Sequence, residues 1–131
     1  MDYKKIYDKE YFTGKKSLFY FLGYGRFSKY FFDSLFRPLK PYLEKSGEAN
    51  VLDVGCAFGL MLERFSNNYK KYGIDVSKYA IEKARGRIPS GNFMVCNAEQ
   101  DFSFPREFFD VIICNNLLEH LSKPGKALEN I

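Results

Sequence analysis

The feature that most constrains the fold is an apolar run that passes directly into a turn bearing two glycines. Residues 51–59 read Val-Leu-Asp-Val-Gly-Cys-Ala-Phe-Gly, and the first four are typical of a buried strand. Gly55 and Gly59 allow a tight turn and the close approach of a ligand to the backbone. The first amides of a following helix would add unpaired donors at the same place. This segment therefore predicts a strand, a ligand-binding turn and a helix in succession.

The part of the chain from residue 47 onward alternates short β-rich runs with helical segments. This alternation is typical of βαβ units and predicts an α/β fold with a parallel sheet. The run Val-Ile-Ile at residues 111–113 is apolar on both faces, as a buried parallel strand requires. We expect strands at 51–54, 72–74, 93–96 and 110–114, and helices at about 60–67, from a cap at Ser77 to about Arg87, and over parts of 117–131.

The first 46 residues differ in character and are expected to form an N-terminal region distinct from the core at 47–131. Residues 1–16 are polar and rich in tyrosine, which indicates an arm lying over another part of the protein. From 17 to about 44, apolar residues recur at roughly helical spacing, which predicts two helices broken near the glycines. Packing against the sheet is the expected fate of their apolar stripe, with contact to membrane lipid as the alternative. The residues that interrupt the pattern are Gly23, Gly25, Pro38 and Pro41.

Charge, hydropathy and cysteine content exclude several classes of protein. Twenty Lys and Arg against sixteen Asp and Glu give a net charge of +4, scattered along the chain, so binding to nucleic acid is not expected. The longest apolar stretch, residues 18–25, is far shorter than the roughly 20 residues of a membrane span. The charged N-terminus also lacks the apolar core of a secretion signal. Cys56, Cys96 and Cys114 form no CxxC pair and are odd in number, so we expect reduced thiols, no metal site and a cytoplasmic protein.

The glycine turn favours a cofactor without a pyrophosphate. A dinucleotide fingerprint reads GxGxxG, but Ala57 takes the place of its second glycine and nothing replaces its third. A nicotinamide-dependent oxidoreductase is therefore the weaker alternative. Asp75 follows Gly59 by sixteen positions (75 − 59) at the end of the second expected strand, where one carboxylate can accept from both hydroxyls of a ribose. The alternative role of Asp75 is to help cap the helix after Ser77. Asp53, in the strand before the turn, can accept a proton from an ammonium group.

These residues together resemble the class I S-adenosylmethionine-dependent methyltransferases of the small-molecule type. Four motifs agree with that family in order and spacing, and the opening residues 7–12, Tyr-Asp-Lys-Glu-Tyr-Phe, look like the arm that often precedes such cores. The resemblance implies a Rossmann-like, doubly wound parallel sheet of order 3-2-1-4 with N-terminal helices. It also implies that the later strands of the family are missing, which would leave an open edge and a possible homodimer through the fourth strand. The motifs lie at 53–59, 75, 96–99 and 109–121.

The resemblance also implies a role for each motif in binding S-adenosylmethionine. The glycine turn would pass beneath the methionine part, Asp75 would hold the ribose, Asn97 and Ala98 would edge the adenine, and Asn115 would face the methionine side. Asn97 replaces a frequent aspartate but can still accept from an adenine amino group. Ala57, where the family often has glycine, is tolerable because no phosphate must approach. The implied cofactor-binding residues are Asp53, Gly55, Cys56, Ala57, Gly59, Asp75, Val76, Asn97, Ala98, Glu99 and Asn115.

The resemblance implies methyl transfer to an unidentified, small-molecule acceptor. Methyl transfer is an in-line displacement at an activated sulfonium, so holding the two reactants close and aligned supplies much of the catalysis. No obligatory catalytic residue follows from this chemistry. His120, the single histidine, is a weak candidate for a general base and matches a structural motif of the family. The alternative hypothesis is a noncatalytic or incomplete module that binds the cofactor and lacks the acceptor side of the site.

Overall fold

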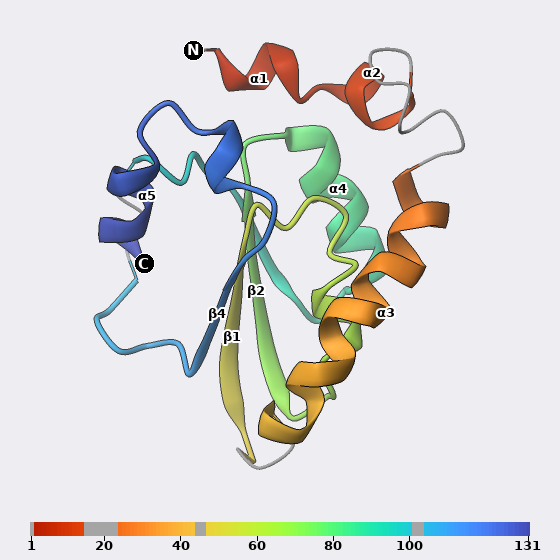
Figure 1. Ribbon diagram of the computed structural model, residues 1–131, viewed down its shortest axis with the longest axis vertical. Coiled ribbons are helices and arrows are strands. Elements are labelled where there is room, and N and C mark those ends of the chain that lie inside the picture. Colours follow the sequence, from red (N-terminus) through yellow and green to blue (C-terminus); the bar gives the residue numbers. More distant parts are fainter. Residues whose placement is uncertain (1, 15–23, 44–46, 101–103) are drawn as a thin grey trace.

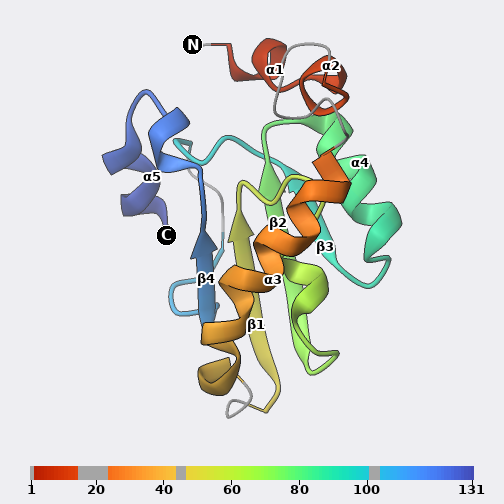
Figure 2. The same ribbon diagram turned by 45° about the vertical axis from the view of Figure 1, so that its right-hand side comes forward.

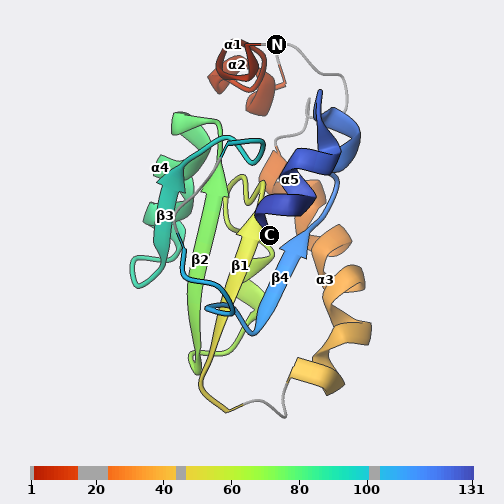
Figure 3. The same cartoon turned by 90° about the vertical axis from the view of Figure 1, so that its left-hand side faces the viewer.

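A four-stranded parallel sheet forms the centre of the protein. The computed structural model describes residues 2–14, 24–43, 47–100 and 104–131. The strands are β1 (Ala49–Val54), β2 (Tyr69–Asp75), β3 (Asn92–Val95) and β4 (Val111–Cys114), arranged in the order β3-β2-β1-β4 (Figure 3). All three neighbouring pairs are parallel. The expected fold class and strand order are thereby confirmed.

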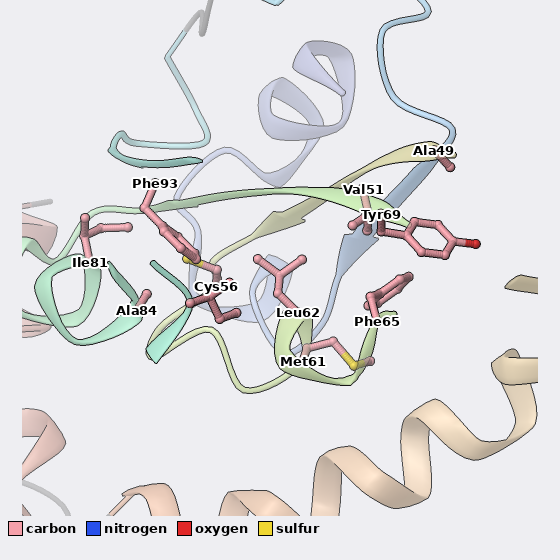
Figure 4. Packing of buried hydrophobic residues seen from close by; sticks show 11 residues of the cluster. Ala49, Val51, Cys56, Met61, Leu62, Phe65, Tyr69, Ile81, Ala84 and Phe93 are labelled. Carbon is pink, nitrogen blue, oxygen red and sulfur yellow. The ribbon is translucent and has the colours of Figure 1, made fainter. Parts of the chain in front are cut away.

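Strand β1 lies at the centre of the sheet because both its faces are apolar. Val51, Leu52 and Val54 are each 0% exposed, and their side chains alternate between the two faces. Val51 belongs to the apolar cluster on the face of α3 and α4, whereas Leu52 and Val54 belong to the cluster on the face of α5. Figure 4 shows the first cluster, which surrounds Leu62 and Cys56 beneath the sheet. Burial on both faces fixes β1, and with it the position of the glycine turn that follows it.

Helices cover the two faces of the sheet. Helix α3 (Tyr24–Leu43) and helix α4 (Lys78–Arg87) lie on one face, and α5 (Pro124–Asn130) lies on the other (Figures 2 and 3). Helix α4 begins where the sequence predicted, because the hydroxyl of Ser77 accepts a hydrogen bond from the Ala80 N–H at 3.3 Å. The expected interrupted helix near the C-terminus is also confirmed, as the short 3₁₀ turn η3 (Leu118–His120) precedes α5.

The expected helix at 60–67 is wrong. The structure has one short 3₁₀ turn there, η2 (Leu62–Arg64). Leu60, Met61 and Leu62 are consecutive and nearly fully buried, at 3%, 3% and 0% exposure, and a regular α-helix turns three consecutive residues toward different sides. Burying all three against the sheet therefore favours a tighter, irregular path. No α-helix therefore adds unpaired amide donors to the glycine turn.

The N-terminal helical region differs from the prediction in one respect. Helix α3 runs through Gly25, Pro38 and Pro41 without a break, so these residues do not interrupt it. Both prolines lie in its last two turns, where each removes one backbone donor. The helix packs on the core as expected, through Phe32, Leu35, Phe36 and Leu43, and this burial offsets those losses. Of the stripe that the spacing indicated, Leu35 is among these residues, whereas Phe31 and Leu39 are 43% and 41% exposed. A helix before Gly23 would fall within 15–23, outside the described residues.

Strand β4 is less buried than its sequence predicted. Ile112 is 38% exposed, and Val111 and Ile113 are only partly buried. The reason is topological, because among the described residues β4 pairs with β1 alone and leaves its other edge open.

Within the same residues, no helix is long and apolar enough to cross a membrane.

Two single-turn helices form an arm above the sheet. Helix α1 (Tyr3–Ile6) and helix α2 (Lys9–Phe12) lie over the carboxyl ends of the strands in every view (Figures 1 to 3). Asp8 begins α2 by accepting from the backbone N–H groups of Glu10 and Tyr11, at 3.0 and 3.1 Å. The arm that the sequence indicated is therefore present, and it lies over the edge where the predicted site residues gather.

Candidate functional site

The glycine turn crosses from the end of β1 to the end of β2. Gly55, Ala57 and Gly59 have φ angles of +80°, +44° and +72°, in the region that glycine occupies without strain. The N–H groups of Gly55 and Cys56 donate to the carbonyl oxygen of Ile74, at 2.8 and 3.0 Å. This backbone pairing holds the turn against the neighbouring strand, so it is a fixed surface at the carboxyl edge of the sheet.

Asp75, the last residue of β2, ties this turn to the start of α4. Its Oδ2 accepts from the N–H of Ala57 at 2.9 Å, and its Oδ1 accepts from the N–H of Ser77 at 2.8 Å. Burial raises the pKa of this carboxyl, and hydrogen bonds from the Ser77, Ala57 and Val76 amides oppose the rise. A carboxylate has about four acceptor positions, so acceptor capacity remains for a hydroxyl donor beside these amides.

Asp53 presents a buried carboxyl beside the turn. It is 5% exposed. Burial, and then the negative charge of Asp75, raises its pKa to about 7. A buried carboxylate is unfavourable unless a donor, a cation or water meets it. The pair Asp53 and Asp75 therefore fits a ligand that carries an ammonium group and vicinal hydroxyls, which is the chemistry of an amino-acid nucleoside.

Cys56 is a packing residue of the turn. A Cβ added to Gly73 would lie 2.8 Å from its sulfur, so the absence of a side chain on β2 makes room for the thiol. Burial raises the pKa of Cys56 well above its usual value, and the charges of Asp53 and Asp75 raise it further. The thiol stays protonated and is therefore no nucleophile. Like Cys96 and Cys114, it forms no disulfide.

The residues after β3 lie beside Asp75, as their place in the sequence predicted. The N–H of Cys96 donates to the carbonyl oxygen of Asp75 at 2.9 Å. Asn97 Oδ1, expected to accept from an adenine amino group, already accepts from the Glu99 N–H at 3.0 Å. Ala98 is buried against the α5 face of the sheet. This segment is thus held by its own hydrogen bonds at the edge of the site.

The residues after β4 approach the glycine turn from the other side. A Cβ added to Gly55 would lie 3.2 Å from Cδ1 of Leu117, which makes close packing a second reason for glycine there. Asn115 directly follows β4 and is partly exposed. The exposed His120 ring lies edge-on to the ring of Tyr7, with centroids 6.0 Å apart. His120 is therefore at the same edge of the sheet, next to the arm.

The structure adds contacts of the arm to the site that the sequence did not predict. The ring of Phe12 lies 5.0 Å from that of Phe58, in the glycine turn, and 6.3 Å from that of Tyr79, in α4. Tyr3 is bound to Glu99 and Ser122. A signal existed in the sequence, because Tyr3, Tyr7 and Tyr11 recur every four residues in an otherwise polar segment.

Comparisons with known proteins agree on one family. Residues 52–131 match the family model described as "Methyltransferase domain". A ubiquinone biosynthesis O-methyltransferase of Shewanella sp. (strain ANA-3) is 31% identical over 84 residues, covering 60% of this chain and 36% of the relative. One of Azoarcus sp. (strain BH72) is 34% identical over 83 residues, with the same shares. The chain thus spans about a third of the length of the curated relatives that it matches.

Solved structures with the same fold include proteins named for different reactions. The plantazolicin methyltransferase BpumL, in complex with a desmethyl analogue and S-adenosylhomocysteine, has a TM-score of 0.63 at 26% identity, covering 80% of this chain and 42% of that one. The YcgJ protein of Bacillus subtilis has a TM-score of 0.61 at 28% identity, covering 69% and 41%. The [4+2]-cyclase SpnF has a TM-score of 0.63 at 26% identity, covering 75% and 39%.

Proposed function

Because this chain belongs to the family of methyltransferase domains, we propose that it binds S-adenosylmethionine and takes part in transferring the methyl group to a small-molecule acceptor. The observation that carries the proposal is the pair of acidic side chains, Asp53 and Asp75, on either side of the amides of the glycine turn. They offer acceptors for an ammonium group and for ribose hydroxyls at one edge of the sheet. No basic side chain is needed there, because the cofactor has no phosphate.

Each predicted residue has a proposed part in holding the cofactor. Asp75 accepts from the ribose hydroxyls, Asp53 meets the ammonium group, and the turn that includes Gly55, Cys56, Ala57 and Gly59 supports the methionine part. A second group of residues lies beside the adenine and beside the methionine part of the cofactor. It comprises Val76, Asn97, Ala98, Glu99 and Asn115. The hydrogen bond that Asn97 Oδ1 accepts from Glu99 leaves it one further acceptor position.

The proposed contribution of the chain to methyl transfer is positioning. The bound cofactor supplies an activated methyl group on a sulfonium, and the residues of the site hold it still and exclude water. The protonated thiol of Cys56 does not compete with the acceptor for the methyl group. His120 stays a weak candidate for a general base, since its exposed ring contacts Tyr7.

The proposal also covers the methyl acceptor, the domain organisation of the chain, and its partners and cellular setting. A small-molecule acceptor is supported by the names of the relatives, which are ubiquinone biosynthesis O-methyltransferases. We propose that residues 1–46 form the arm and covering helix and that 47–131 form the cofactor-binding core. The open edge of β4 supports a homodimer, and three unpaired cysteines support a cytoplasmic setting. Neither nucleic acid nor membrane is a proposed partner.

Calorimetric titration with S-adenosylhomocysteine tests cofactor binding, with NADH as the comparison ligand. We expect binding of the first and none of the second, because Ala57 replaces the glycine that a pyrophosphate requires. Binding of NADH alone would favour the oxidoreductase hypothesis. Binding of neither ligand contradicts the proposed function.

A noncatalytic cofactor-binding module is the second candidate. The similarity to a structure named a cyclase shows that this fold does not by itself imply methyl transfer. Incubation with S-adenosylmethionine carrying a labelled methyl group, together with a panel of phenols, amines and thiols, separates the two. Transfer of label to any acceptor excludes the noncatalytic module.

A further inference from the structure

The N-terminal arm, residues 2–14, contacts the segment that follows every strand of the sheet. Phe12 and Phe58 bring it onto the turn after β1, and Phe12 and Tyr79 bring it onto the start of α4 after β2. Tyr3 reaches Glu99 after β3 and Ser122 after β4. The proposed cofactor residues belong to these same four segments, so the arm spans the whole site from above (Figure 1).

At one end of the arm, the hydroxyl group of Tyr3 joins two loops. The Tyr3 oxygen lies 3.1 Å from Glu99 Oε1 and 2.9 Å from Ser122 Oγ, and its one proton goes to either of them. The same oxygen accepts from the backbone N–H of Ser122 at 2.6 Å. Glu99 Oε1 also accepts from the Lys123 N–H at 2.5 Å. Tyr3 is 6% exposed, so this polar contact is shielded from water and the loops after β3 and β4 meet at it.

The other end of the arm is held by apolar contacts. Phe12 is 5% exposed and forms one cluster with Ala57 and Ala80, against which Phe58 and Tyr79 pack. The methyl group of Ala57 is therefore a contact surface for the arm, on the same residue whose N–H is bound by Asp75. A displacement of the arm would uncover the turn that the cofactor is proposed to lie on.

The arm has little structure of its own. Helices α1 and α2 have four residues each, and helices of one turn are unstable in water because nucleation fixes several residues for one hydrogen bond. Its order therefore depends on its contacts with the rest of the protein, among them those of Tyr3, Phe12 and Tyr7. Loss of a contact at either end weakens the attachment of the arm to the loops above the sheet.

We propose that the arm is a strap that closes over bound S-adenosylmethionine, with the Tyr3 hydroxyl as its latch, and that opening the strap limits cofactor release. This inference rests on the proposed function. Tyr3 is a positioning residue, since it acts through the loops of Glu99 and Ser122. The Tyr3 hydroxyl favours retention of the cofactor only while the strap is closed. Removing this hydroxyl should therefore raise the rate of cofactor release more than it lowers the free energy of unfolding.

The test measures release of labelled S-adenosylhomocysteine after dilution of the loaded full chain into excess unlabelled ligand. Tyr3→Phe removes the hydroxyl and keeps the buried ring, and Tyr30→Phe is the matched control, since Tyr30 is 80% exposed on α3. We expect release from Tyr3→Phe on the order of fivefold to tenfold faster than from the control, the effect of losing one shielded hydrogen bond. Amide hydrogen exchange of residues 2–14 should slow when the ligand binds the unmodified chain, and slow less in Tyr3→Phe.

The outcomes separate the two proposals. Equal release rates for Tyr3→Phe and Tyr30→Phe, with normal ligand binding by both, overturn the strap and leave the proposed function standing. No binding of S-adenosylhomocysteine by the unmodified chain overturns the proposed function and the strap together.

Discussion

Asp75 Oδ2 accepts a hydrogen bond from the backbone N–H of Ala57, across 2.9 Å, and so joins the end of β2 to the middle of the glycine turn. The contact links two residues eighteen positions apart that the sequence assigned to the same ligand. One carboxylate thus both shapes the turn and remains open to further donors. Its substitution should therefore affect ligand binding and stability together.

Asp75→Asn should weaken binding of S-adenosylhomocysteine by about tenfold to a hundredfold. The amide has one acceptor oxygen in place of two, and it cannot serve the Ala57 and Ser77 N–H groups and the ribose together. The free energy of unfolding should fall by about 1–2 kcal/mol as a buried donor loses its partner. Calorimetry and urea unfolding measure the two effects.

Asp33→Asn is the control, since Asp33 is an exposed acid on α3 that pairs with Arg64. It should leave ligand affinity unchanged. If Asp75→Asn binds the ligand as tightly as the unmodified chain, this carboxylate does not bind the ribose.

The unliganded protein should lose stability as the pH rises from about 4 to 7. The pKa of Asp53 is about 7 in the folded chain against 3.8 for an ordinary aspartate, so the folded state holds more protons in this interval. Stability from this group is full below the unfolded pKa and is lost as the pH rises through the folded one. The raised pKa of Asp75 acts in the same direction. Urea unfolding at intervals of one pH unit measures the slope.

Asp53→Asn isolates the contribution of Asp53. This variant should be more stable than the unmodified chain at pH 8, by up to a few kcal/mol, and should show a smaller decrease with pH. Saturating S-adenosylhomocysteine should also reduce the decrease in the unmodified chain, because its ammonium group favours the carboxylate. Identical pH profiles for the two proteins would contradict the raised pKa.

Gly73→Ala should destabilise the fold by about 1–3 kcal/mol, the range for overpacking a core. Its Cβ would lie 2.7 Å from Cδ1 of Phe93 and 2.8 Å from the sulfur of Cys56, so β3 or the glycine turn must shift. Gly86→Ala in α4 is the matched control, since its Cβ meets nothing within 4 Å, and it should stabilise the helix by about 0.5–1 kcal/mol. Equal unfolding free energies for the two variants would show that the packing at Gly73 is loose.

The chain should associate at high concentration through the open edge of β4. Light scattering should then give a mass that rises above 15.3 kDa with concentration. Ile112→Lys, on β4, should reduce the association, because a charge on an edge strand opposes pairing. Met94→Lys is the control on β3, at the opposite edge, with a similar exposure of 41% against 38%. A monodisperse monomer at all concentrations argues against the homodimer.

The strands and the edge at which the site gathers could be predicted because their determinants are local. The apolar side chains of Leu52 and Val54 are enough to predict a buried strand. The carboxyl ends of parallel strands share one edge of the sheet, so the order of the elements predicts that Asp53, Asp75 and Asn97 lie near one another. The segment 60–67 could not be predicted in this way, since three consecutive apolar residues fit a helix or a buried turn equally well. Packing against the sheet decides between these alternatives.

The contacts of the arm could not be predicted because they join distant parts of the sequence. The spacing of Tyr3, Tyr7 and Tyr11 indicates an aromatic face on the arm, but it does not identify the residues against which that face packs. The partners Phe58 and Ser122 carry no pattern of their own. The exposure of Ile112 depends likewise on whether a strand lies beside β4, and nothing within 111–114 specifies that neighbour.

The contact between Tyr3 and Ser122 joins residues 119 positions apart, which places the earliest and the latest parts of the described chain side by side. During synthesis Tyr3 emerges from the ribosome 119 residues before Ser122, its partner in the anchoring loop. At roughly 5–20 residues per second, the rings of Tyr3 and Phe12 stay uncovered for several seconds. A nascent chain of this protein therefore presents an aromatic segment to chaperones and proteases until translation has passed Ser122.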